Sequence, residues 1–190
     1  ESTIFPAFDR LFTTTGELNK RLSKNGLRAN LWPLACAYAP HDFSPAVKPS
    51  KTLRIGYFGS TYYEQGIEWL VKHWPKEHEL HIYGPGKFSG TNIFSHAPLP
   101  MDELRRKVLP NIDAIIIPAL PIGRMPHVAI TKSYDYLAFQ RPIIAADHMM
   151  AGLLRTRFPQ APVQSCSARE GDLPACVAGH VARARAAGQG

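Results

Sequence analysis

The chain has 190 residues, of which 45% are hydrophobic and 19% charged, so it can bury a core and is not of the disordered class. No apolar run approaches the ~18 residues that a membrane span needs, and residues 1–3 do not resemble the start of a signal peptide. The net charge is +7, but basic residues are not interleaved with aromatics as in a nucleic-acid groove. We therefore expect no nucleic-acid partner; a solvated face accounts for the charge best, and peripheral contact with an anionic membrane is the next alternative.

Cysteine and histidine spacing predicts no metal site. Cys36, Cys166 and Cys176 are odd in number and lack ligand spacing, so they are expected to be thiols in a reducing, cytoplasmic compartment. The eight histidines do not pair at ligand spacing, and there is no Asp-x-Asp pair.

The first 50 residues differ in character from the rest. Residues 10–16 predict a strand that leads into a short helix at 17–24, and residues 30–35 predict another extended segment. Residues 39–52 contain three prolines and little apolar content, which is typical of a linker. The chain does not begin with Met, which suggests a piece of a longer protein. We expect residues 1–50 to be a segment carried over from a preceding domain and its linker, and 51–190 to be one domain.

From residue 53 onward, predicted strands alternate with predicted helices. The strands are expected at 53–60, 79–83, 92–95, 113–118 and 141–147, and the helices at 67–74, 100–109, 132–139 and 177–187. The run at 113–118 is apolar without alternation, as in a strand that is covered on both faces. This order predicts an α/β fold with a Rossmann-like parallel sheet and helices on both faces.

Ligands of such sheets bind at the carboxyl ends of the strands, where the strand order reverses. Candidate site residues should therefore directly follow the predicted strands. These positions are Gly59 to Thr61, Tyr83 to Gly86, Pro118 to Arg124, and Asp147 with His148.

The order of these segments resembles the C-terminal domain of GT-B glycosyltransferases, including the group-1 (retaining) enzymes. Thr13–Thr15 and the segment at 34–45 stand where that family has a Thr/Ser-rich strand and a P-N-G-V-D-x-x-x-F-x-P turn, although the Asn-Gly is absent. Residues 56–61 and 81–86 match its two glycine loops. The most specific match is KSYDYLAFQRPIIA at 132–145, against K-x-x-E-Y-L-A-x-G-x-P-V-V-A. The same lysine is shared with xanthan-type glucuronosyltransferases of bacterial exopolysaccharide assembly.

The resemblance implies a donor site for a nucleoside-diphosphate sugar of the UDP or GDP type, with no separate cofactor. Lys132 would hold the diphosphate, and Asp135, at i+3 on the same helix, would accept bonds from the ribose; an ordinary exposed lysine and a local ion pair are the alternatives. The other candidate residues of this site are Gly59, Ser60 and Thr61 in the first loop, Tyr83 and Gly84 beside the base, and Arg124 as a second cation.

The catalytic residue is unknown, because the resemblance implies that the base of an inverting enzyme would lie in the missing N-terminal domain. Departures from the family pattern leave the phosphate contacts and the retaining or inverting outcome open. Asp135 replaces the usual Glu, His127 stands where a first Glu is common, and the usual Arg or Lys after the first glycine loop is not evident. The resemblance implies sugar transfer to a lipid-linked or polysaccharide acceptor at the inner face of a bacterial membrane, with the acceptor domain missing and this piece inactive alone. A sugar-nucleotide epimerase of the same fold, or a non-catalytic α/β receiver-like or ligand-binding domain, are the alternatives.

Overall fold

The computed structural model describes residues 12–13, 16–31, 52–61, 66–118, 132–146, 148–161, 163–165 and 172–187. Within these ranges the main feature is a parallel sheet of six strands. In spatial order these are β5 (Ile93–His96), β4 (Glu79–Tyr83), β3 (Arg54–Phe58), β6 (Ala114–Ile117), β7 (Ile143–Ala145) and β8 (Val163–Ser165).

The strand order reverses between β3 and β6. The chain starts at β3, continues outward through β4 to β5, and then returns to the other side of β3 to form β6, β7 and β8. This is the order of Rossmann folds, in which ligands bind outside the carboxyl ends of the two central strands. By this rule, the candidate binding site lies next to residues 59–61, which follow β3.

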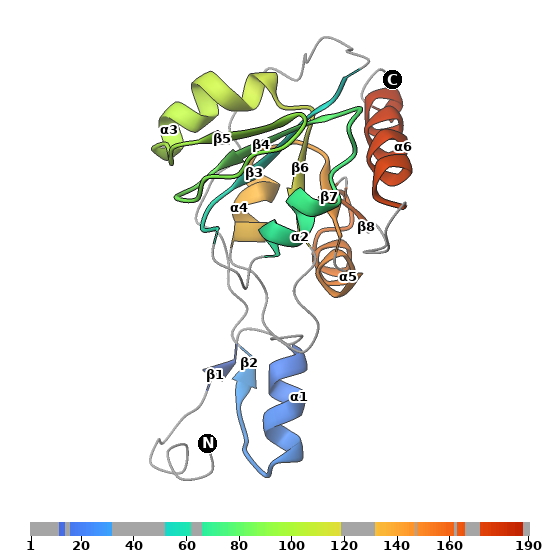
Figure 1. Cartoon of the computed structure of the whole chain (residues 1–190). Coiled ribbons are helices and arrows are strands. Elements are labelled where there is room, and N and C mark those ends of the chain that lie inside the picture. Colours follow the sequence, from blue (N-terminus) through green and yellow to red (C-terminus); the bar gives the residue numbers. More distant parts are fainter. Residues whose placement is uncertain are drawn as a thin grey trace.

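Helices cover both faces of the sheet, as the sequence predicts (Figure 1). On one face, α2 (Ile67–Lys72) and α6 (Asp172–Ala187) supply Ile67, Leu70, Leu173 and Val177 to a core with Ile55 and other strand residues. The opposite core contains side chains from α4 (Lys132–Ala138), α5 (His148–Arg157) and the turns after α3 (Met101–Glu103). All four residues of β6 are buried, because both layers pack on that strand.

A smaller unit precedes the sheet. The strands β1 (Phe12–Thr13) and β2 (Asn30–Leu31) pair in parallel, and α1 (Gly16–Lys24) connects them. Figure 1 shows this unit apart from the six-stranded sheet. Its buried Leu22 belongs to neither core of the sheet.

The predicted fold class is confirmed, and the differences are local. The helix after residue 100 continues from α3 as a π-helical turn (Leu104–Val108) and a 3-10 turn (Leu109–Asn111). No element is predicted from the sequence at α5 or β8, and the predicted final helix begins five residues after the first residue of α6. Cys176 is disulfide-bonded, so the expectation of a thiol is wrong for this residue. Within the described parts of the chain, no helix has the length and apolarity to span a bilayer.

Candidate functional site

The turn after β3 is built on two glycines. Gly59 has φ of +130°, a conformation that side chains other than glycine rarely adopt, and its N–H donates to the Tyr83 carbonyl at 3.0 Å. A Cβ on Gly84, which follows β4, would collide with the Gly59 carbonyl oxygen and would lie 2.6 Å from Thr61 Cγ2. Thr61 Oγ1 also accepts from the Gly86 N–H at 3.0 Å. The loops after β3 and β4 therefore pack against each other at the carboxyl edge of the sheet.

Lys132 lies over the turn that follows β3. Its Nζ donates to Tyr57 Oη at 2.5 Å and to the Ser60 carbonyl at 3.4 Å, and it lies 4.6 Å from the centre of the Tyr57 ring. A Cβ on Gly59 would lie 3.2 Å from Lys132 Nζ. Glycine at this position therefore avoids a close contact with the lysine side chain. The structure thus brings Lys132 together with Gly59 and Ser60.

The amine at this position is partly buried, and no residue in the described ranges supplies a counter-ion. Burial lowers the pKa of Lys132 from its ordinary 10.5 to about 8. Burial also raises the pKa of Tyr57, so the phenol keeps its proton and donates it to the Ser60 carbonyl while accepting from Lys132. No carboxylate of a described residue forms an ion pair with Lys132. The arrangement suits an anionic ligand that would supply the missing charge.

Tyr136 attaches α4 to the end of β3. Its hydroxyl donates to the Phe58 carbonyl at 2.6 Å and accepts from the Phe58 N–H at 3.0 Å. The side chain is 1% exposed, and its ring meets Phe58 edge-on at 6.2 Å between centroids. These two hydrogen bonds hold α4, the helix that carries Lys132, against the end of β3. Tyr57 and Tyr136 are not predicted as site residues from the sequence, because their partners become known only when the contact between β3 and α4 is seen.

Asp135 lies one turn after Lys132 and is partly buried. No ion pair joins these two described residues, since Lys132 bonds to Tyr57 and Ser60 instead. The alternative of a local i,i+3 pair is therefore not seen. The predicted second cation, Arg124, and His127 lie outside the described residues, and so does Asp147.

Tyr83 is partly buried at the end of β4. Its ring stacks on Phe58 with centroids 5.3 Å apart and on His96 with centroids 4.3 Å apart. Tyr83 therefore packs against two neighbouring rings, and Gly84 lies beside the turn that follows β3.

Histidines do pair in space, although not in sequence. His81 on β4 and His96 on β5 lie with ring nitrogens 3.0 Å apart. The signal in the sequence is the period of two in Glu79, His81 and Tyr83, which places them on one face of a strand. Among the described residues, no group of three or more His, Cys, Asp or Glu side chains is arranged to hold a metal ion.

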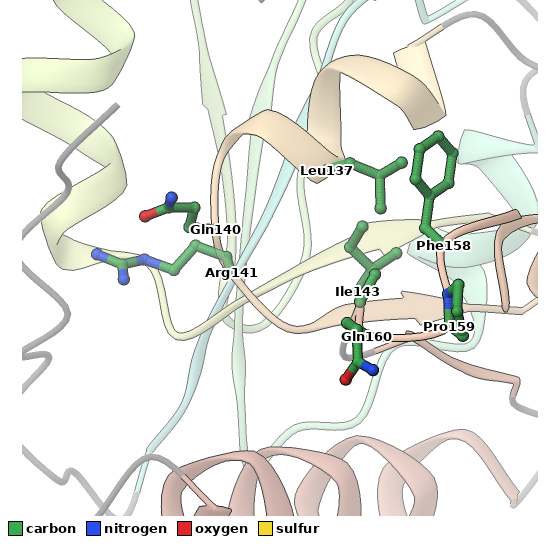
Figure 2. Close-up of a pocket in the computed structure, with 8 residues that line it drawn as sticks. Leu137, Gln140, Arg141, Ile143, Phe158, Pro159 and Gln160 are labelled. Carbon is green, nitrogen blue, oxygen red and sulfur yellow. The ribbon is translucent and has the colours of Figure 1, made fainter. Parts of the chain in front are cut away.

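A cavity of about 580 Å³ lies at the opposite, amino-terminal edge of β7 (Figure 2). It is lined by Leu137, Gln140, Arg141, Ile143, Phe158, Pro159, Gln160 and Ala161. The lining is mainly apolar, and Arg141 points away from it because its guanidinium donates twice to the Leu109 carbonyl, at 3.1 and 3.0 Å. This cavity contains none of the predicted site residues.

No family model and no curated protein matches this chain. Solved structures do resemble it. The chain superimposes on a mutant of S. aureus TarM in complex with Fondaparinux, alpha-GlcNAc-glycerol and UDP, with a TM-score of 0.55, 11% identity, and coverage of 76% of this chain and 31% of that one. A second TarM structure gives a TM-score of 0.51, 12% identity, and coverage of 74% and 30%.

These likenesses show the fold. The chain forms a Rossmann-like α/β domain of the kind found in GT-B glycosyltransferases. A weaker match, with a TM-score of 0.44 and 12% identity, is the glycotransferase of kitacinnamycin, with 91% of this chain and 46% of that one covered. The chain spans about a third of the length of the TarM structures.

Proposed function

We propose that this chain is the donor-binding domain of a glycosyltransferase, and that Lys132 binds the diphosphate of a nucleoside-diphosphate sugar. The observation that supports this most is a partly buried amine without an ion-pair partner among the described residues, placed at the carboxyl edge of β3 where the strand order reverses. Diphosphate oxygens are strong acceptors for a charged amine in such a place.

The surrounding turn fits the same ligand. Gly59 is exposed to solvent, and Ser60 and Thr61 are partly exposed at the end of β3. Asp135, on the same helix as Lys132, is in our proposal the acceptor for the ribose hydroxyls. The fold neighbour in complex with UDP supports a donor of the UDP type over the GDP type.

The finer parts of the function follow from the family resemblance. In this proposal a further domain binds the acceptor, which is a lipid-linked or polysaccharide molecule of the bacterial envelope. The positive charge would draw the protein to the anionic inner face of the membrane. The chain by itself would bind the donor without transferring its sugar.

Calorimetric titration of the chain with UDP and GDP tests the proposal. We expect saturable binding of one nucleotide, and we expect Lys132→Ala to weaken it by about ten- to a hundredfold, as loss of a hydrogen bond to a charged group implies. Lys107→Ala is the matched control. Lys107 is exposed and forms an ion pair with Glu103 at 2.8 Å in the helical turn after α3, away from Lys132. Equal affinity of the two variants, or binding of neither nucleotide by the unchanged chain, would refute a donor site at Lys132.

A further inference from the structure

Two histidines meet at the outer edge of the sheet, one on β4 and one on β5. In the parallel register His81 lies opposite Phe94, and Tyr83 lies opposite His96. His81 Nδ1 lies 3.0 Å from His96 Nε2, and His81 Nε2 lies 3.0 Å from Glu79 Oε2. Both histidine side chains are only partly buried, so protons can reach them from solvent.

The contact between the two imidazoles limits their total charge. A neutral imidazole has one N–H group and one lone pair, whereas a charged imidazolium has two N–H groups and no acceptor. One of the two facing nitrogens must accept, so at most one of His81 and His96 can be charged while the contact persists. This limit holds whichever ring carries the charge and whichever tautomer the other ring adopts.

The charged groups on this face of the sheet act in the same direction. Burial, and then the charge of His81, lowers the pKa of His96. Glu79 Oε2 accepts from Arg54 Nε of β3 at 3.1 Å, and its contacts with His81 and Arg54 lower the pKa of this carboxyl. Tyr83, the other titratable side chain on this face, stays neutral because burial raises its pKa. The charged side chains at 102–107, in the helical segment after β5, shift the pKa of neither Glu79 nor His96.

The strand β5 lies at the edge of the sheet, and among the described strands it pairs with β4 alone. The hydrogen bonds between the two strands include one from the Leu80 N–H to the Asn92 carbonyl at 2.8 Å and one from the Gly84 N–H to the His96 carbonyl at 3.2 Å. Gly84 also packs against the Gly59 carbonyl oxygen. Loosening of β5 would therefore reach the loop that packs on the turn after β3.

We propose that His81 and His96 form an acid-sensitive switch, in which a second proton breaks their contact and loosens β5 from β4. With that proton, two N–H groups and two positive charges would face each other across the 3.0 Å contact. The rings must then separate, and each ring is attached to one of the two paired strands. The switch uses none of the residues of the proposed donor site, so it operates whether or not Lys132 binds a diphosphate.

The pH range of the switch follows from His96. Its pKa in the folded chain lies below the ordinary value of 6.5, so the opened strand binds this proton more tightly than the closed one. The pairing of β4 and β5 is therefore fully stable above about pH 6.5 and weakens as the pH falls below that value. The pKa of Glu79 is lowered from 4.5, so protonation of this carboxyl weakens the structure only at a lower pH.

The first test is an NMR titration of the histidine rings from about pH 8 to about pH 4.5. We expect His81 and His96 to titrate in two separate steps, the second of them below about pH 6.5. In His81→Gln, the pKa of His96 should rise, because the neighbouring charge is gone while the amide can still donate or accept. Titration of both rings in a single step, or a His96 pKa that does not rise in His81→Gln, would overturn the switch.

The second test is hydrogen exchange of the Leu80 and Gly84 amides, which donate from β4 to β5. The Ile115 amide is the internal control, because it donates at 2.8 Å to the residue before β7. After correction for the pH dependence of chemical exchange, protection of Leu80 and Gly84 should fall at least about threefold from about pH 7 to about pH 5. Protection of Ile115 should stay constant.

Two matched variants assign the fall in protection to the histidine pair. His96→Gln should remove it, because the amide keeps a polar contact with His81 and does not titrate. His73→Gln, at the end of α2, should leave it unchanged. Constant protection of Leu80 and Gly84 in the unchanged chain, or a fall that persists in His96→Gln, would overturn the switch.

Discussion

Lys132 and Tyr57 are 75 positions apart in the chain, yet the ammonium and the phenol define the site together. The amine lies against an aromatic ring and two oxygens, neither of which carries a full charge. Desolvation is thus not offset by an ion pair among the described residues, and the pKa of Lys132 falls to about 8. An anionic ligand would reverse that shift, because it favours the charged form.

Nucleotide affinity should depend on pH through this amine. Below pH 8 Lys132 is protonated and pairs with the diphosphate; above pH 8 the free protein loses the proton, so affinity should fall by up to about tenfold per pH unit. Arginine stays protonated over this range, so Lys132→Arg should bind with little pH dependence. Calorimetry from about pH 7 to about pH 9.5, a range that brackets this pKa, measures both. A falling affinity in the arginine variant as well would assign the effect to another group.

A Gly→Ala substitution should change the free energy of unfolding in opposite directions at two positions, Gly84 and Gly152. Gly84→Ala should destabilise the fold by about 1–3 kcal/mol, because the new methyl group meets the backbone of Gly59 and Thr61 Cγ2. Gly152→Ala should stabilise it by about 0.5–1 kcal/mol, because Gly152 lies inside α5 with no atom within 4 Å of the added Cβ. Urea unfolding of both variants checks the pair, and equal effects would mean that the loops after β3 and β4 do not pack as described.

At the scale of elements, α4 is held on the sheet by Tyr136. A seven-residue helix has little stability of its own. Its position therefore depends on packing and on the two bonds between the Tyr136 hydroxyl and Phe58. Through these bonds, the end of β3 and the start of α4 form one rigid support for Lys132.

Tyr136→Phe should destabilise the chain by about 1–3 kcal/mol, because it leaves the Phe58 N–H and carbonyl buried without that partner. Tyr83→Phe is the control. It removes a hydroxyl that forms no hydrogen bond with any described residue, and the change should stay within about 0.5 kcal/mol. Chemical denaturation of both variants measures the difference. Similar midpoints would show that the Tyr136 hydroxyl does not fasten α4.

The elements that the sequence predicts well are those with strong local signals. The apolar run of β6 and the glycine that follows β3 each identify a strand or its end. The helix α5 was missed because Gly152 interrupts a weakly patterned stretch, and β8 is only three residues long. The pairing of His81 with His96 depends on the register of β4 and β5, which a single sequence does not contain.

For the whole molecule, the reversal of strand order decides where a ligand belongs. The carboxyl edge of β3 presents Gly59 to Thr61 under Lys132, whereas the cavity between α4, α5 and β7 lies at the other edge. Neither core of the six-stranded sheet includes a described residue before Leu53. This agrees with the expectation that residues 51–190 form a domain of their own, which stays a prediction.

The central claim is that the carboxyl edge of the sheet binds a nucleotide. Titration of the nitrogen-15-labelled chain with UDP, followed by amide chemical shifts, tests it most directly. We predict saturable shifts at Gly59, Ser60, Thr61 and Lys132, with little change at Phe158 and Gln160 of the opposite cavity. Shifts that centre on that cavity, or no saturable shift at any residue, would contradict the account.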